Sequence, residues 1–258
     1  MLGPNEVRRF DPFLMLDAFD SHNPSDYTKG FPFHPHRGIE TVTYLIKGTI
    51  NHQDSLGNKG TIKSGESQWM TAGSGILHQE MPQATEHLLG LQLWINLPKE
   101  KKMITPKYFH ITGEMIKKVI EPNAIIRVIS GDYKGNSGIK GDHMDILMLD
   151  IQVTPGKEFS LKTDPEANVF AYIIEGNGHF RSKNTRSISN KVAVLFSKEE
   201  DFYVEAGHDG IRFILFGGYP LNEPIAWGGP IVMNTRREIE EAFAEIGNNT
   251  FIKHTPNS

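Results

Sequence analysis

Five side chains that could bind a metal ion lie within one stretch of the sequence, residues 31–82. They are His34, His36, Glu40, His78 and Glu80. Alternate residues of an extended strand face the same side, so the first three would share one face, and so would the last two. Imidazole and carboxylate groups together suit a first-row transition ion such as iron, manganese, cobalt, nickel or copper. The chain has no cysteine, which argues against a structural zinc site made of thiolates.

Short strands separated by turns are the elements expected to position these groups. Residues 39–46 read IETVTYLI, a run rich in β-branched and aromatic side chains that ends at Lys47-Gly48. Residues 91–97 alternate between apolar and more polar side chains, as in a strand with two unlike faces. The 25 glycines and 15 prolines are spread between such runs. The sequence therefore predicts an all-β fold, in which inward positions of a small barrel hold several rigid ligands around one point.

Composition narrows the possible functions. The 258 residues include 27 Lys and Arg against 31 Asp and Glu, a formal charge of −4, with no block of like charge. This balance argues against direct, non-specific nucleic-acid binding. The start of the chain lacks the apolar region of a signal peptide, and no apolar run is long enough to cross a bilayer. We expect a soluble, cytoplasmic protein with no membrane partner.

An internal repeat predicts two domains. Tyr172 and Gly176 each lie 128 positions after Tyr44 and Gly48. We place the domains at 1–130, which binds the metal, and at 131–258, which lacks the ligands and ends in a helix. At the same offset the residues equivalent to His34, His36 and Glu40 are poorer ligands: Lys162, Asp164 and Asn168.

A second alignment concerns the later half of the repeat. Pairing Ala72-Gly73 with Ala206-Gly207 places Arg212 opposite His78 and Ile214 opposite Glu80. Both alignments predict that the second domain keeps the barrel and has lost the site.

One amphipathic helix is expected near the C-terminus, in the run REIEEAFAEIG. Its apolar residues recur at helical spacing, with Thr235 as a candidate N-cap and Gly247 as a stop: Ile239, Ala242, Phe243 and Ile246. Near the metal motif, the apolar residues Phe33, Trp69 and Met70 are candidate walls of a substrate pocket, although a core role would suit each of them as well.

The runs HPHRGIETVTYLIKG and QWMTAGSGILHQEMP resemble the cupin superfamily, and specifically the pirin family of paired cupins. The runs DPFLMLDAF, HQDSLGNKG, GLQLWINLP, VISG and GPIVMNT are also similar to pirin segments, so the resemblance covers most of the chain. It implies two tandem, jelly-roll-like cupin β-barrels with one short C-terminal helix. Pirins usually carry further residues before the run that resembles DPFL, so we expect the first barrel to lack an N-terminal edge.

The resemblance also implies a ligand set. Pirins take their fourth ligand from the glutamate two positions after the later histidine, which gives His34, His36, His78 and Glu80. Glu40 fits the spacing of cupins in general, so two carboxylates compete for one role. The resemblance favours Glu80 and leaves Glu40 as a candidate to orient a histidine ring.

The resemblance implies a dioxygenase of the quercetin 2,3-dioxygenase type, which would use Fe(II) to cleave flavonols, small aromatic substrates. Glu80 would then also accept the substrate proton as a catalytic residue. The alternative of another class is a non-enzymatic, iron- and redox-sensing regulator that binds a protein partner, either a transcription factor or a metabolic enzyme. A zinc-dependent sugar isomerase using Glu40 with the three histidines, and a metal-free structural double barrel, are the remaining readings.

Overall fold

Antiparallel strands make up most of the chain in the computed structural model, which describes residues 3–181, 185–196 and 201–254. The chain divides into two compact units. The first unit contains Gly3–Asn5, Phe13–Gly113 and residues 221–254, and the second contains Glu6–Pro12 and Glu114–Pro220. This division differs from the predicted boundary at residue 130, because residues 221–254 pack on the first barrel through contacts that join distant parts of the sequence.

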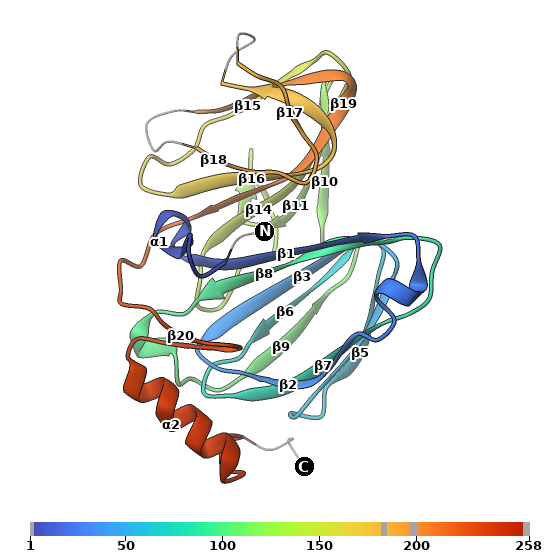
Figure 1. Cartoon of the computed structure of the whole chain (residues 1–258). Coiled ribbons are helices and arrows are strands. Elements are labelled where there is room, and N and C mark those ends of the chain that lie inside the picture. The colour runs from blue at the N-terminus through green and yellow to red at the C-terminus, as the bar shows by residue number, and fades with distance from the viewer. Residues whose placement is uncertain (1–2, 182–184, 197–200, 255–258) are drawn as a thin grey trace. The chain divides into compact units, whose positions relative to one another are not determined.

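Two sheets form the barrel of the first unit (Figure 1). One has five strands, in the order β1 (Phe13–Ser21), β8 (Leu88–Asn96), β3 (Ile39–Lys47), β6 (Glu66–Thr71) and β9 (Lys107–Ile111). The other has four strands, in the order β2 (Phe31–His36), β7 (Ile76–Pro82), β4 (Thr49–Asp54) and β5 (Lys59–Lys63). Two short 3-10 turns, Pro24–Asp26 and Lys99–Lys101, lie in the connections.

Gly38 separates β2 from β3 and so divides the predicted ligand triplet. Its φ is +77°, in the left-handed region that favours glycine. The chain turns here, so His34 and His36 belong to the four-stranded sheet, whereas Glu40 belongs to the five-stranded one. The prediction that one strand carries all three residues is therefore wrong.

Residues 221–254, here called the C-terminal segment, contain a short hairpin and the predicted helix. The hairpin pairs β20 (Ala226–Gly228) with β21 (Ile231–Met233), and α2 spans Arg236–Gly247. The predicted N-cap is confirmed: Thr235 and Glu238 form a reciprocal capping box. The buried face of α2 packs with the hairpin and the tail in one apolar cluster: Ile231, Met233, Ile239, Ala242, Ile246, Phe251 and Ile252. Phe243, the remaining member of the predicted stripe, is 48% exposed.

The second unit is built on one eight-stranded sheet and the one-turn helix α1 (Val7–Phe10). Six strands follow in order: β10 (Lys117–Ile120), β11 (Ala124–Ser130), β14 (Ile146–Val153), β19 (Phe202–Gly218), β16 (Asn168–Phe180) and β17 (Ile188–Ser189). Off this path, β15 (Glu158–Leu161) pairs with β19, and β18 (Ala193–Leu195) pairs with β16. A separate hairpin joins β12 (Asp132–Tyr133) to β13 (Asn136–Ser137).

The strand ladders support the repeat but correct the second alignment. Phe180 lies 128 positions after His52 and pairs with Val204, as His52 pairs with Glu80. Val204 therefore takes the place of Glu80, and Phe202, two residues earlier, takes the place of His78. Arg212 instead pairs with Gln152 across β14 and β19.

Aromatic side chains fill the interior of the second unit where the first unit has its polar groups. Phe180, Phe202 and Val204 are all nearly inaccessible, and the rings of Phe180 and Phe202 lie 6.1 Å apart. Apolar packing there replaces the polar cluster. Among the described residues, no helix is both long and apolar enough to span a membrane.

Gly38 and Gly65 offer a matched test of how the C-terminal segment is held. Their φ values are +77° and +82°, but a Cβ on Gly38 would lie 2.0 Å from the carbonyl oxygen of Val232, whereas one on Gly65 would meet nothing within 4 Å. We expect Gly65→Ala to lower the free energy of unfolding by about 1–2 kcal/mol through its backbone conformation alone. Gly38→Ala should cost more, because the C-terminal segment must also move.

Urea unfolding followed by tryptophan fluorescence makes this comparison, since Trp69, Trp94 and Trp227 all lie in the first unit. Equal losses in the two variants would show that the close contact with Val232 does not matter.

Candidate metal centre

Three histidines meet on the inner face of the four-stranded sheet. His34 on β2 lies directly opposite His78 on β7, and His36 follows two residues later on the same side of β2. One ligand nitrogen from each ring falls within 4.8 Å of the others. In the described part of the chain this is the one such group of histidine and acidic residues. The predicted histidine ligands are thus brought together.

Backbone carbonyls orient two of the three rings. His34 Nδ1 lies 2.8 Å from the carbonyl oxygen of Pro32, and His36 Nδ1 lies 2.9 Å from that of Pro230. A carbonyl only accepts, so each Nδ1 carries the proton and each Nε2 keeps its lone pair. The two Nε2 atoms then face each other across 3.1 Å, where their lone pairs repel unless a cation lies between them. The donor set therefore fits a metal ion.

Burial keeps the His36 and His78 rings neutral. His36 is 1% exposed, and burial, followed by the neighbouring His34, lowers its pKa to about 3 despite the hydrogen bond to Pro230. Burial likewise lowers the pKa of His78 well below its usual range, with further contributions from His36, His34 and His52. Neither nitrogen of the buried His78 ring has a hydrogen-bond partner. A neutral ring with a free lone pair is the form that binds metal.

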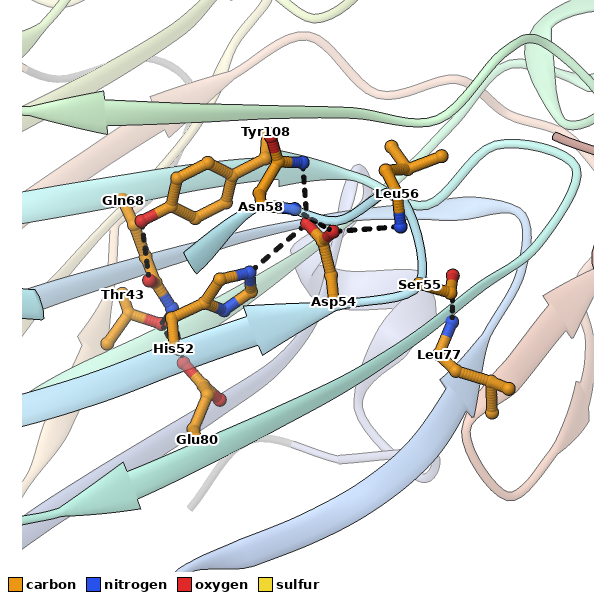
Figure 2. Close-up of polar contacts among 10 residues, drawn as sticks. All are labelled: Thr43, His52, Asp54, Ser55, Leu56, Asn58, Gln68, Leu77, Glu80 and Tyr108. Atoms are coloured by element: carbon orange, nitrogen blue, oxygen red, sulfur yellow. Dashed lines mark hydrogen bonds and ion pairs between the residues drawn. The ribbon is translucent and has the colours of Figure 1, made fainter. Parts of the chain in front are cut away.

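Glu80 lies beside the histidines and is held by three donors from the facing sheet. Thr43 Oγ1 donates to Oε1 over 3.1 Å, Gln92 Nε2 donates to Oε2 over 2.6 Å, and Gln68 Nε2 also donates to Oε1. Figure 2 shows Gln68 and Thr43 directed at the Glu80 carboxylate. Both carboxylate oxygens are thereby occupied by donors, which fixes the orientation of a buried acid.

The three donors belong to one polar row that crosses the five-stranded sheet. Thr43 lies opposite Gln92 on β8 and Gln68 on β6, and Gln92 lies opposite Asp17 on β1. Directly opposed residues share a face, so all four side chains point to the barrel interior. Gln92 also donates to Thr43 over 3.0 Å and accepts from Trp94 Nε1 over 3.0 Å.

His52 and Tyr108 extend this network from Gln68 to Asp54 (Figure 2). His52 lies opposite Glu80, stacks on Tyr108 with ring centroids 4.3 Å apart, and has its Nε2 3.3 Å from Asp54 Oδ2. Burial, then the charges of Asp54 and Glu80, raise the pKa of Tyr108 to about 12. Tyr108 therefore keeps its proton and donates to Gln68 Oε1 over 3.4 Å, which turns the amide nitrogen of Gln68 towards Glu80.

Asp54 anchors the same network to a turn. Burial alone would raise its pKa, but hydrogen bonds from the side chains of His52 and Asn58 and from the Asn58 backbone lower it. Oδ1 accepts from the backbone of Leu56 and of Asn58, and Oδ2 accepts from Asn58 Nδ2 over 2.8 Å. Asp54 therefore links the tight turn between β4 and β5 to His52.

Glu40 is placed away from the histidines. It lies three residues before Thr43 on β3, so its side chain faces the opposite side of the sheet. There Thr71 Oγ1 donates to its Oε1 over 2.7 Å. This placement corrects the expectation that Glu40 orients a histidine ring, and the turn at Gly38 is the reason.

A cavity of about 470 Å³ opens beside His34, His36 and Glu80. Its walls are mainly aromatic and apolar, with polar groups from the row described above and two further charged residues, Asp26 and Lys29. The remaining lining residues are Met15, Asp17, Phe19, Tyr27, Gly30, Phe31, Thr43, Ile50, Pro82, Leu88, Gln92, Trp94 and Pro230. A pocket of this size and composition suits a small organic ligand.

The three wall residues expected from the sequence do not line this cavity. Trp69 follows Gln68 and so faces the other side of its sheet, while Met70 is buried opposite Tyr108. Phe33 alternates with His34 and is 50% exposed. Their nearness in sequence to the motif misled the prediction, because much of the actual wall comes from β1, β8 and the C-terminal segment.

Several residues of the site were missed in the sequence: Thr43, His52, Asp54, Gln68, Gln92, Tyr108 and Pro230. The alternation of residues 91–97 separated Gln92 from its apolar neighbours, and this pattern could have indicated that Gln92 faces the site. No sequence pattern indicated the carbonyl of Pro230, because 194 positions separate it from His36.

Comparisons with known proteins agree with the fold. The Pirin family model matches residues 2–95, and the model for the pirin C-terminal cupin domain matches residues 148–252. A pirin-like protein of Solanum lycopersicum is 40% identical over 253 residues, covering 97% of this chain and 86% of the relative.

Two solved structures extend the comparison. A crystal structure of quercetin 2,3-dioxygenase from Acinetobacter baumannii is 33% identical with a TM-score of 0.90, over 97% of this chain and 90% of that one. The bacterial pirin YhhW from Escherichia coli, in complex with nickel(II), is 28% identical with a TM-score of 0.63, over 82% of this chain and 84% of that one. The all-β paired-cupin fold is confirmed.

The lowered pKa values predict how metal-free protein responds to acid. The unfolded chain takes up protons on His36 and His78 below pH 6.5, whereas the folded chain resists them until about pH 3 at His36. Stability is therefore fully present above pH 6.5 and is lost as the pH falls towards 3, by up to about 1.4 kcal/mol per pH unit for each ring. Urea unfolding in the presence of a chelator, at pH 7.5, 6.0 and 5.0, measures this slope.

His36→Gln should flatten the slope, and His208→Gln serves as its control because the His208 side chain is 99% exposed. A wild-type slope in His36→Gln would mean that the buried ring does not resist protonation.

Proposed function

This chain belongs to the pirin family, and we propose that it is a metal-dependent dioxygenase that cleaves flavonols in the manner of quercetin 2,3-dioxygenase. The observation that carries this proposal is the convergence of three imidazoles and Glu80 at one end of a mainly apolar, aromatic-walled cavity. A reaction between an aromatic substrate and oxygen needs these features together: a metal, an acid or base, and a pocket that excludes water.

The proposed ligands are His34, His36, His78 and Glu80, and the proposed ion is Fe(II). Manganese, cobalt, nickel and copper also suit this donor set, and a nickel complex exists for the Escherichia coli relative. When bound, the ion would supply a Lewis acid and a template that orients substrate and oxygen.

Glu80 is also the proposed proton acceptor. Its carboxylate lines the cavity, where a flavonol hydroxyl beside the histidines would meet it. Thr43, Gln68 and Gln92 hold it in one orientation, so no reorganisation is needed when the proton moves. Gln92 also lines the cavity. It accepts a hydrogen bond from Trp94 and donates one to Glu80, so it connects these two residues.

The walls of the cavity suit a planar, hydroxylated ring system. Phe31 and Trp94 offer flat aromatic faces, and Asp17 offers a carboxyl group on the polar row. Burial raises the pKa of Asp17, as expected for an acid among apolar neighbours. We propose that Asp17 hydrogen-bonds a substrate hydroxyl away from the ion, while the aromatic walls stack on the rings.

Oxygen uptake by protein reconstituted anaerobically with Fe(II) tests the assignment when quercetin is added. His78→Ala should abolish uptake, and Glu80→Gln should lower kcat by about a hundredfold or more, the range over which a positioned acid or base contributes. Glu121→Gln, the same chemical change in the second unit, should leave uptake unchanged.

Unchanged turnover in Glu80→Gln would remove its catalytic role. Absence of turnover in wild-type protein shown to hold one iron per chain would instead favour the iron-sensing regulator, and the test would move to partner affinity in the ferrous and ferric states.

The positioning role of Gln92 gives a separate prediction. Gln92→Leu removes a hydrogen bond to a charged partner, worth about 1.5–3 kcal/mol, and should lower turnover by about tenfold to a hundredfold. Gln79→Leu is the matched control, because Gln79 lies next to Glu80 on β7 but faces outward to Gln53. Equal activity in the two variants would show that Gln92 does not position Glu80.

A further inference from the structure

The C-terminal segment, last in the sequence, reaches a metal-ligand candidate near the start of the chain. The carbonyl oxygen of Pro230 accepts from His36 Nδ1 over 2.9 Å. Directly after this contact along both segments, Ile231 forms a bridge with Arg37, and the backbone N–H of Val232 donates to the Arg37 carbonyl over 3.1 Å. The proton position on His36 thus depends on where the C-terminal segment lies.

An aromatic stack makes a second link between the C-terminal segment and the site. Trp227 on β20 stacks on Trp94, with ring centroids 6.1 Å apart and planes at 19°. Trp94 in turn meets the His36 ring edge-on, with centroids 4.8 Å apart. Trp94 also donates to Gln92, which holds Glu80. Both the histidine cluster and Glu80 are therefore one or two contacts from the C-terminal segment.

Arg37, directly after His36, anchors the far end of the C-terminal segment. Its Nε donates to the carbonyl oxygen of Ser74 over 2.7 Å, and its Nη2 donates to Glu245 Oε2 over 2.5 Å. The guanidinium also lies over the Phe251 ring, 4.4 Å from its centroid. Arg37 is 2% exposed, so these contacts stabilise a buried charge, and those to Glu245 and Phe251 are lost if the C-terminal segment moves away.

Lys102 joins the turn after β2 to the C-terminal segment. Its buried ammonium donates to the carbonyl oxygens of Gly38 and Val232 over 2.9 and 3.0 Å, and to Asn96 Oδ1 over 2.6 Å. The two residues that follow His36, Arg37 and Gly38, are thus tied to the C-terminal segment, so the docking of that segment and the placement of the His36 ring are connected.

We propose that docking of the C-terminal segment and metal binding at the three histidines are coupled, with Pro230 as the positioning residue. The docked segment holds His36 in the tautomer and orientation that present Nε2 to the ion. In other metalloproteins, loss of the hydrogen-bond partner of a metal-binding histidine weakens metal binding by about 10–100-fold. By linkage, the bound ion must stabilise the docked segment by the same factor. This inference rests on the metal site of the proposed function and not on its dioxygenase chemistry.

Hydrogen exchange of the wild-type protein with and without nickel(II) tests the coupling directly. Nickel is used because it binds imidazole strongly. We expect saturating nickel to slow exchange of the α2 amides by at least about tenfold. The strands β14 and β19 of the second unit are the internal reference and should not change. Equal exchange in α2 with and without bound nickel would overturn the proposal.

A pair of double variants tests the reverse direction. Glu245→Gln with Phe251→Ala removes two anchors of Arg37 without altering any residue of the histidine cluster. Nickel affinity, measured by competition with a chelator, should fall by about tenfold because the apparent Kd rises as the docked fraction falls. Glu240→Gln with Phe243→Ala makes the same two changes at exposed positions of α2 and should bind nickel like the wild type.

The outcomes separate the two proposals. Equal nickel affinity in both double variants would overturn the coupling and leave the dioxygenase assignment in place. Coupling observed in protein that never turns over quercetin would support this inference and count against the proposed reaction. Wild-type protein that binds no nickel at all would overturn the coupling together with the metal site.

Discussion

Burying several ionisable side chains inside one small barrel costs free energy, and this cost determines how the interior of the first unit is arranged. Imidazoles and a carboxylate lose their hydration there, and each must find a hydrogen-bond partner or a metal ion. The structure meets this demand with backbone carbonyls at His34 and His36 and with three donors at Glu80. The nitrogens of His78 and the facing lone pairs of His34 and His36 are left available to a cation.

The second unit shows the other solution to the same constraint. Its ladder places Phe180, Phe202 and Val204 where the first unit has His52, His78 and Glu80. These apolar side chains pack with no polar group to satisfy, so the barrel needs neither a donor row nor an ion. The two units therefore share a strand plan while differing in what their interiors can bind.

Support for the site comes from three directions, each with its own physical role. The four-stranded sheet supplies the proposed ligands, and the five-stranded sheet supplies the polar row that holds Glu80. The C-terminal segment supplies the acceptor for His36 and, through Trp227, backs the cavity wall at Trp94. A change in either sheet or in the C-terminal segment therefore affects the histidines or Glu80 through one or two contacts.

The sequence by itself determined which residues could bind a metal and that they lie on strands. The candidates His34, His36 and His78 were readable because alternation and residue type depend on the local backbone, whereas only the resemblance to pirins favoured Glu80 over Glu40. Helix α2 was readable from its period and its cap. Tertiary structure alone decided the rest. The turn at Gly38 sent Glu40 to the opposite face, strand register aligned Gln92 and Gln68 with Thr43, and folding brought Pro230 to His36 across 194 positions. Such contacts depend on how distant strands pair and pack, which no local pattern of residues records.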